Sequence, residues 1–231
     1  MQHPLTYSAA GGVATITIDD GKVNVMSLAL LIDLSLLVER ARAERAMIVL
    51  RSGRESIFSA GFDMKTLSGG NRDAATAMLG AGVRLIVDLL QHPYPVISVC
   101  SGHAYPMGAF LLMASDMRIG IRGDYLIGLN EVAIGIAVPD FALALARYRL
   151  AAPYAHRTAV LGEMFGPDDA MRAGFLDLVV ERDAAEATLA QALRQLGKLD
   201  MAAHASTKQR MRAAVVEEIS EALARRLLPA A

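Results

Sequence analysis

Residues 96–121, VISVCSGHAYPMGAFLLMASDMRIGI, contain one complete strand–helix–strand unit of the expected fold. The β-branched run Val96–Cys100 predicts a buried strand, and Met117–Ile121 predicts a second one. Between them, a glycine-broken turn leads into an apolar helix that ends near Ser115. A strand, a helix and a strand in this order favour a βαβ unit, whose strands lie parallel in one sheet.

The same alternation extends in both directions from this unit. Upstream, strands are expected over residues 13–18 and 47–50, with a helix after Ser27, a loop over 52–70 and a helix over 74–91. Downstream, we expect three short helices, one last strand (176–180) and two amphipathic helices. Those helices cover residues 139–147, 152–161, 168–173, 183–196 and 202–228.

The chain is therefore predicted to form an α/β core over residues 1–195 and a helical C-terminal region over 196–231. Apolar residues recur every three or four positions in the last helix, including Met211, Val215 and Ile219. We expect this helix to pack on a neighbouring subunit or over the functional site.

Composition narrows the class of protein. The chain has 231 residues, a formal net charge of -1 and 54% apolar residues. Such a balance provides no field that would attract nucleic acid or a membrane surface. The only cysteine is Cys100, so no intrachain disulfide is expected. We see neither a signal peptide nor a run of about 18 apolar residues, and we expect a cytoplasmic protein.

Two loops could bind an anion through backbone N–H groups. The first, FSAGFDM (58–64), follows a strand and contains small residues that allow close approach to the main chain. The second, GHAYPMGAF (102–110), opens a helix, whose first N–H groups are unpaired. Each could instead be an ordinary packed turn, with Asp63 capping a helix in the first. His103 could line the site or pack against its turn.

A third segment, IGLNEVAIGI (127–136), contains one acid in apolar surroundings. Glu131 is the only charged residue between Asp124 and Asp140. Burial raises the pKa of a carboxyl group and makes it usable as a base. The alternative is a Glu131 that is ion-paired or lies at the surface.

In this order, the three segments resemble the crotonase superfamily, the enoyl-CoA hydratases and isomerases. GGVATITIDDGKVNVMS near the start and TKQRMR near the end extend the resemblance over roughly residues 10 to 212. It implies a spiral of βαβ units, a homotrimer or hexamer, an acyl-CoA substrate of fatty acid metabolism, and neither a metal nor a cofactor beyond the coenzyme A of the substrate.

By position, the resemblance implies an oxyanion hole made by the N–H groups of Phe62 and Met107, with Glu131 as the base. Met107 replaces the usual glycine, which a backbone donor tolerates. The other residues expected near the substrate are Ser59, Ala60, Gly61, Asp63, Met64, Gly108, Phe110 and Asp140. Lys65, Lys208 and Arg212 could meet coenzyme A phosphates or be solvated surface charges.

One departure from the family pattern affects the expected reaction. Family hydratases use two glutamates, and the first of these positions is Phe110 here. A single carboxylate can still move a proton from carbon 2 to carbon 4 of a 3-enoyl thioester, so an isomerase is the first hypothesis. A hydratase with a replacement acid, for which Asp140 is the candidate, is the second, although Asp140 reads better as a helix cap. A non-catalytic acyl-CoA-binding protein is the third.

Overall fold

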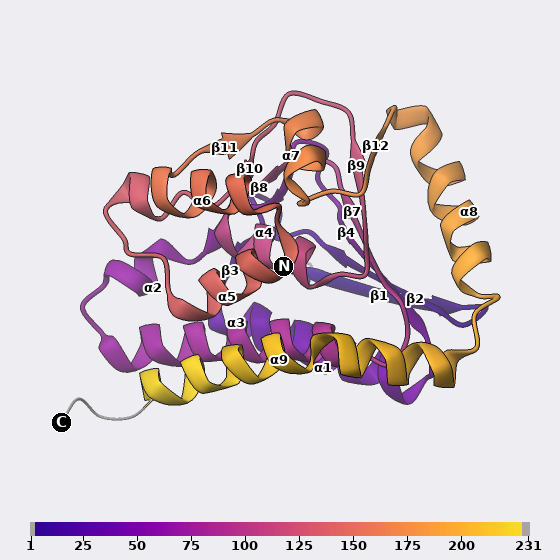
Figure 1. Ribbon diagram of the computed structural model, residues 1–231, viewed down its shortest axis with the longest axis horizontal. Coiled ribbons are helices and arrows are strands. Elements are labelled where there is room, and N and C mark those ends of the chain that lie inside the picture. The colour runs from indigo at the N-terminus through magenta and orange to yellow at the C-terminus, as the bar shows by residue number, and fades with distance from the viewer. Residues whose placement is uncertain (1–2, 228–231) are drawn as a thin grey trace.

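Six strands form the largest sheet of the computed structural model, which describes residues 3–227 (Figure 1). In order across the sheet they are β1 (Leu5–Ala10), β2 (Val13–Ile18), β4 (Met47–Ser52), β7 (Val96–Cys100), β9 (Met117–Ile121) and β12 (Leu178–Val180). Only β1 and β2 are antiparallel within this sheet, and the other neighbours are parallel. The predicted parallel βαβ core is confirmed.

Shorter strands form two further sheets beside the large one. The four-stranded sheet consists of β11 (Met164–Phe165), β10 (Ile127–Gly128), β8 (His103–Ala104) and β5 (Ile57–Ser59). The remaining pair, β3 (Val25–Met26) and β6 (Gly61–Phe62), is parallel. After β4, β7 and β9 the chain adds a short strand to the second sheet before the next helix, so successive repeats form a spiral.

Helices cover both faces of the large sheet. They are α1 (Leu28–Ala43), α2 (Met64–Ser68), α3 (Arg72–Gln91), α4 (Pro106–Ala114), α5 (Asp140–Arg149), α6 (Ala152–Leu161), α7 (Pro167–Ala173), α8 (Ala185–Leu196) and α9 (Met201–Leu227), with 3-10 turns η1 (Val132–Ile134) and η2 (Arg182–Ala184). Strand residues alternate between two clusters, so Ile48 and Leu50 face the main core while Val49 packs toward α8. Within residues 3–227, no helix is long and apolar enough to cross a membrane.

The N-terminal strand β1 was not expected from the sequence. It pairs antiparallel with β2 through a hairpin at Gly11 and Gly12, whose φ angles are 57° and 76°. Both values lie in the left-handed region that a type I′ hairpin turn requires and that glycine adopts readily. The glycine pair followed by alternating residues was therefore a usable signal.

One expected loop and several expected boundaries differ from the structure. The segment 52–70 contains β5, β6 and α2 rather than one loop, because strands of two or three residues leave no detectable periodicity. The last strand begins at Leu178, two residues later than expected. Of the final helix, predicted over 202–228, Leu228 lies outside the described residues.

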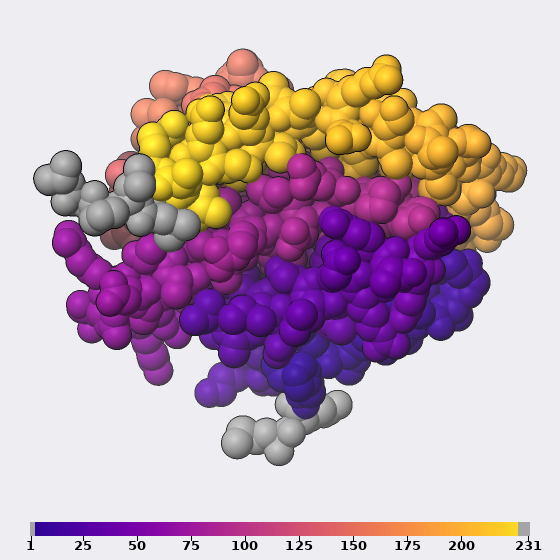
Figure 2. All heavy atoms as spheres, turned by 90° about the horizontal axis from the view of Figure 1, so that it is seen from below, coloured from indigo at the N-terminus to yellow at the C-terminus, as the bar shows by residue number. Residues whose placement is uncertain are grey.

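Helix α9 packs along α3 and α5 of its own chain. Figure 2, which views the molecule from below, shows it in yellow in the upper part of the picture, beside the magenta residues of the middle of the chain. Val215 and Ile219 are buried as expected, whereas Met211, one turn before Val215, is 74% exposed. Packing against a neighbouring subunit stays a prediction.

Two basic residues of α9 are buried, which corrects their expected place at the surface or on coenzyme A phosphates. The side chains of Lys208 and Arg212 each lie 2.6 Å from a carboxylate oxygen of Asp116. Asp116 also accepts a hydrogen bond from the N–H of Val96 at 2.8 Å. Because a buried cation needs an opposite charge, this cluster ties α9 to the start of β7.

Candidate active site

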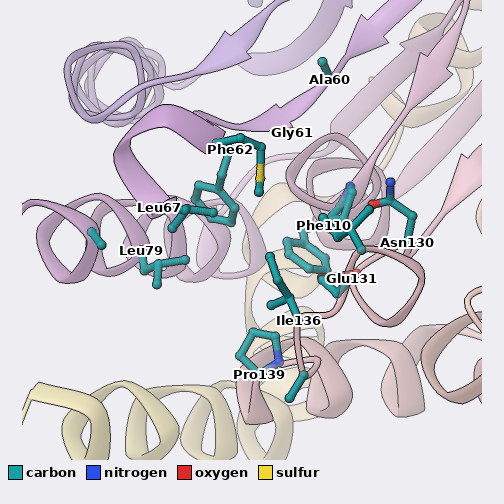
Figure 3. Close-up of a pocket in the computed structure, with 15 residues that line it drawn as sticks. Ala60, Gly61, Phe62, Leu67, Leu79, Phe110, Asn130, Glu131, Ile136 and Pro139 are labelled. Atoms are coloured by element: carbon teal, nitrogen blue, oxygen red, sulfur yellow. The ribbon is translucent and has the colours of Figure 1, made fainter. Parts of the chain in front are cut away.

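A cavity of about 320 Å³ lies between the two glycine-containing loops and the segment after β10 (Figure 3). Fifteen residues line it, and almost all are apolar. They are Ala60, Gly61, Phe62, Met64, Leu67, Ala75, Leu79, Pro106, Phe110, Asn130, Glu131, Ile134, Ile136, Ala137 and Pro139. Figure 3 shows Phe62, Leu67 and Leu79 on one side of the view and Phe110, Glu131 and Ile136 on the other.

The first loop is held by a serine and a glycine. Gly61 has a φ of 88°, and its N–H donates to the hydroxyl of Ser59, which itself donates to the carbonyl of Asn24 at 2.7 Å. In the parallel pair of β3 and β6, the N–H of Asp63 donates to the carbonyl of Met26. Because N–H groups alternate in direction along a strand, the N–H of Phe62 points away from β3.

The second loop presents the N-terminus of α4. Its first intrahelical bond runs from the N–H of Ala109 to the carbonyl of Tyr105, so the N–H of Met107 precedes the helical hydrogen bonds. The side chain of Tyr105 does not cap it. A Cβ atom placed on Gly61 would lie 3.6 Å from the nitrogen of Met107. The two loops are thus in contact beside the cavity.

Glu131 is buried in this apolar cavity. The residue is 7% exposed, and its Oε2 has no hydrogen-bond partner among the described residues. Burial raises the pKa of its carboxyl group to about 7, against a smaller lowering effect of its own backbone N–H. Its carbonyl accepts from the N–H groups of Ile134 and Ile136, which fixes the turn. The ion-paired or exposed alternative is therefore wrong.

Phe110 forms an apolar wall of the same cavity. The residue is 1% exposed, and its ring packs edge-on against Phe141, with ring centroids 5.5 Å apart. In Figure 3, the Phe110 ring lies beside Glu131. The position that would carry a second acid in a two-carboxylate site therefore contributes only hydrocarbon.

The expected site residues divide into two groups. Phe62, Glu131, Ala60, Gly61, Met64 and Phe110 line the cavity. Ser59, Asp63, Met107, Gly108 and Asp140 do not. Among the second group, Asp63 caps α2 by accepting from the N–H of Lys65 at 3.0 Å. Gly108 packs closely on the first loop, because a Cβ there would lie 3.0 Å from that of Ser59.

Asp140 is neither the replacement acid of the site nor the cap of a helix, the two roles expected from the sequence. Pro139 is the N-cap of α5, and Asp140 is the first helical residue without a capping hydrogen bond. Its side chain is 74% exposed and lies 3.9 Å from that of Arg225. An acid in the first turn is favourable to the helix dipole, which explains the residue without any contact to the cavity.

Two supporting residues were missed or left open. Asn24, at φ 55°, is buried, and its side-chain amide lies within 3.1 Å of the carbonyls of Ile18 and Phe58. Asparagine tolerates this left-handed conformation better than most residues, which was the available signal. His103 packs against its turn, accepting from the N–H of Leu126 and stacking on Tyr105.

Comparison with known proteins agrees with this arrangement. The human mitochondrial enoyl-CoA delta isomerase 1 is 28% identical over 214 residues, which cover 91% of this chain and 71% of the relative. An enoyl-CoA hydratase/isomerase family protein from Pseudomonas syringae has a similar structure, with a TM-score of 0.93, 36% identity and 96% of each chain covered. A probable enoyl-CoA hydratase from Mycobacterium tuberculosis has a TM-score of 0.91 at 34% identity, covering 96% of this chain and 94% of that one.

The family profile described as enoyl-CoA hydratase/isomerase matches residues 8–227, which include both loops and the buried glutamate. Together with the spiral of repeats, this match identifies the chain as a member of the enoyl-CoA hydratase/isomerase family, within the crotonase superfamily of enzymes.

Proposed function

We propose that this protein isomerises 3-enoyl-CoA to 2-enoyl-CoA with Glu131 as its single acid–base group. The carboxylate takes a proton from carbon 2, and the electrons of that C–H bond spread into a dienolate over the thioester oxygen. The same carboxyl group then returns the proton to carbon 4, which leaves the double bond between carbons 2 and 3. No atom is gained or lost, so one base is sufficient.

The observation that carries this proposal is the isolation of Glu131. Among the described residues that line the cavity, it is the only ionisable one. Its unpartnered Oε2 is free to approach a substrate proton, and a pKa of about 7 suits a group that must both accept and return a proton.

The dienolate needs stabilisation at its oxygen. We propose that the N–H groups of Phe62 and Met107 supply it. The N–H of Phe62 points away from the paired strand β3, and the N–H of Met107 precedes the first hydrogen bond within α4. Donors fixed in an apolar cavity stabilise a developing negative charge strongly, because no reorganisation is needed when the charge forms.

Hydration of 2-enoyl-CoA is the second candidate, since similar proteins carry hydratase names. That reaction must activate water and deliver a proton to carbon 2, which two acids share in the family hydratases. Phe110 cannot take part, and the side chain of Asp140 is outside the cavity. A hydratase would therefore need Glu131 to perform both tasks.

Three further expectations accompany the proposal. A redox-neutral proton shift needs no cofactor beyond the coenzyme A of the substrate. On the family resemblance, we propose a homotrimer or hexamer in the cytoplasm. Light scattering tests the assembly, and a monomer would contradict it.

The test incubates purified protein with 3-enoyl-CoA and 2-enoyl-CoA separately. Isomerisation leaves the mass unchanged and creates the ultraviolet absorbance of a conjugated thioester, whereas hydration adds one water and removes that absorbance. We expect the first result, its loss in Glu131→Gln, and nearly full turnover in the matched control Asp140→Asn. Rapid hydration with no isomerisation would replace the proposal, and tight binding without either reaction would indicate a binding protein.

A further inference from the structure

Helix α3 contains two buried glycines, Gly80 and Gly82, near its middle. Glycine is among the least favourable residues in a helix interior, because it loses the most backbone freedom on folding. A close neighbour that leaves no room for a side chain is one reason for a glycine there. The surroundings of the two glycines show which of them has such a reason.

The two positions differ in what a side chain would meet. A Cβ atom on Gly82 would lie 2.7 Å from both Cε1 and Cζ of Phe62, and 3.4 Å from Sδ of Met107. A Cβ atom on Gly80 would meet only the flexible end of Arg84 at 3.4 Å and a methyl group of Leu223 at 3.8 Å. Only at Gly82 do the neighbouring atoms leave no room for a side chain.

The two residues in contact with Gly82 are those whose N–H groups form the proposed oxyanion hole. Phe62 belongs to the first loop and Met107 to the second, 45 positions apart by their numbers. Figure 3 shows Phe62 directed toward the helix that carries Leu79, which is α3. Met107 is fully buried. The backbone of α3 at Gly82 thus packs against one side chain from each loop.

We propose that Gly82 is a positioning residue that sets the places of both oxyanion donors. This inference rests on the proposed function, since it concerns the same hole. The ring of Phe62 has two ways to escape an added methyl group: it can swing into the cavity, where the acyl chain would lie, or it can carry its own backbone N–H with it. The contact with Met107 limits adjustment of the second loop.

The expected effect follows from the steep distance dependence of such stabilisation. Removing one donor from an oxyanion hole costs about 100- to 1,000-fold in kcat, and a shift of about 1 Å in a reacting group costs up to about 100-fold. Gly82→Ala displaces a donor without removing it. We therefore expect kcat to fall by about 10- to 100-fold.

The test compares Gly82→Ala with Gly80→Ala, a matched glycine two residues away. Each variant is assayed for isomerase kcat and KM and for thermal unfolding. The carbonyl stretch of a bound saturated acyl-CoA, labelled with carbon-13 at the thioester, is measured by difference infrared spectroscopy. We expect Gly82→Ala to lower kcat and to reduce the carbonyl shift, while Gly80→Ala keeps both and unfolds at an equal or higher temperature.

A rescue experiment separates this contact from general damage. Leucine lacks the two ring atoms that would clash, so Gly82→Ala should cost less than about twofold when added to Phe62→Leu. If Gly82→Ala alone does not fold, recovery of folding in the double variant supports the same contact. Equal losses in both backgrounds, or an unchanged kcat and carbonyl shift in Gly82→Ala, would overturn the inference.

The infrared measurement also distinguishes the two proposals. If the wild-type protein polarises the thioester carbonyl but isomerises nothing, the proposed reaction is wrong, and the shift in Gly82→Ala still tests the positioning role. If the wild type isomerises and Gly82→Ala keeps the full shift, the reaction stands and the positioning role is wrong. A wild type without any carbonyl shift rejects the hole and, with it, the role of Gly82.

Discussion

Replacing Glu131 by glutamine should remove activity and stabilise the protein at the same time. Glutamine has nearly the same shape as glutamate but cannot accept a proton, so isomerase turnover should fall by about 100-fold or more. The opposite effect on stability follows from burial. A carboxyl group whose pKa is raised on folding opposes folding when it ionises, and an amide does not ionise.

The structure gives the size and the pH window of this effect. Burial moves the pKa of Glu131 from 4.5 to about 7. Below about pH 4.5 the carboxyl group is protonated in both states and costs nothing. As the pH rises from 4.5 through 7, the unfolded chain ionises first and wild-type stability falls relative to Glu131→Gln. Above pH 7 the difference in unfolding free energy between the two proteins reaches its full value. At about 1.36 kcal/mol per pKa unit, this value is about 3 kcal/mol.

The assay is urea unfolding of both proteins at pH 4.5 and pH 8. Burial of the amide itself has a cost that does not depend on pH, so it cancels when the two differences are compared. Asp140→Asn changes an exposed carboxylate and serves as the control, for which no comparable pH-dependent gain is expected. A stability difference between wild type and Glu131→Gln that is the same at both pH values would refute the buried, unpaired carboxylate.

Three other predictions test separate parts of the structure. The kcat/KM for 3-enoyl-CoA should rise about tenfold per pH unit below 7 and then level off, since the base acts when ionised, and a flat profile from pH 5 to 8 would contradict this. Asp116→Asn leaves two buried cations without their partner and should cost about 3–5 kcal/mol of unfolding free energy, whereas Glu218→Gln, at an exposed ion pair, should cost less than about 1 kcal/mol. Asn24→Ala leaves buried carbonyls unpaired and should cost about 2–3 kcal/mol by urea unfolding, and a loss below about 0.5 kcal/mol would count against its supporting role.

The βαβ core was predictable because its signals are local. Continuous β-branched runs such as Val96–Cys100 identify strands that are buried on both faces, and the long amphipathic pattern of α3 identifies a helix. The two-residue strands β6 and β8 left no such signal. They exist because each pairs with a segment distant in the sequence, and periodicity within one segment does not report such a partner.

The candidate site was predictable only in part, for a related reason. The type and order of residues identified both loops and the buried Glu131. The supports of those loops depend on contacts across the fold: the amide of Asn24 reaches the carbonyl of Phe58, and Gly82 of α3 contacts one side chain from each loop. Neither residue belongs to a loop that it supports, so no local pattern could assign its role.

The pattern of charges in the sequence led to the wrong location for Lys208 and Arg212 of α9, because such a pattern contains no information on where other helices end. Arg212 donates to the carbonyl of Leu90, near the end of α3, and Lys208 donates to that of Tyr94. The last carbonyls of a helix lack intrahelical partners and favour a nearby cation, which explains the contact of Arg212 with Leu90. Lys208 binds just beyond the end of α3, and Asp116 pairs with both side chains. The cluster thereby attaches α9 to the same helix whose middle contacts Phe62 and Met107. The cluster contacts α3 near its end, whereas the two loops contact α3 at Gly82. Loss of Asp116 should therefore loosen α9 and lower the stability of the protein. The pH dependence of turnover should stay unchanged, because Glu131 is not part of the cluster.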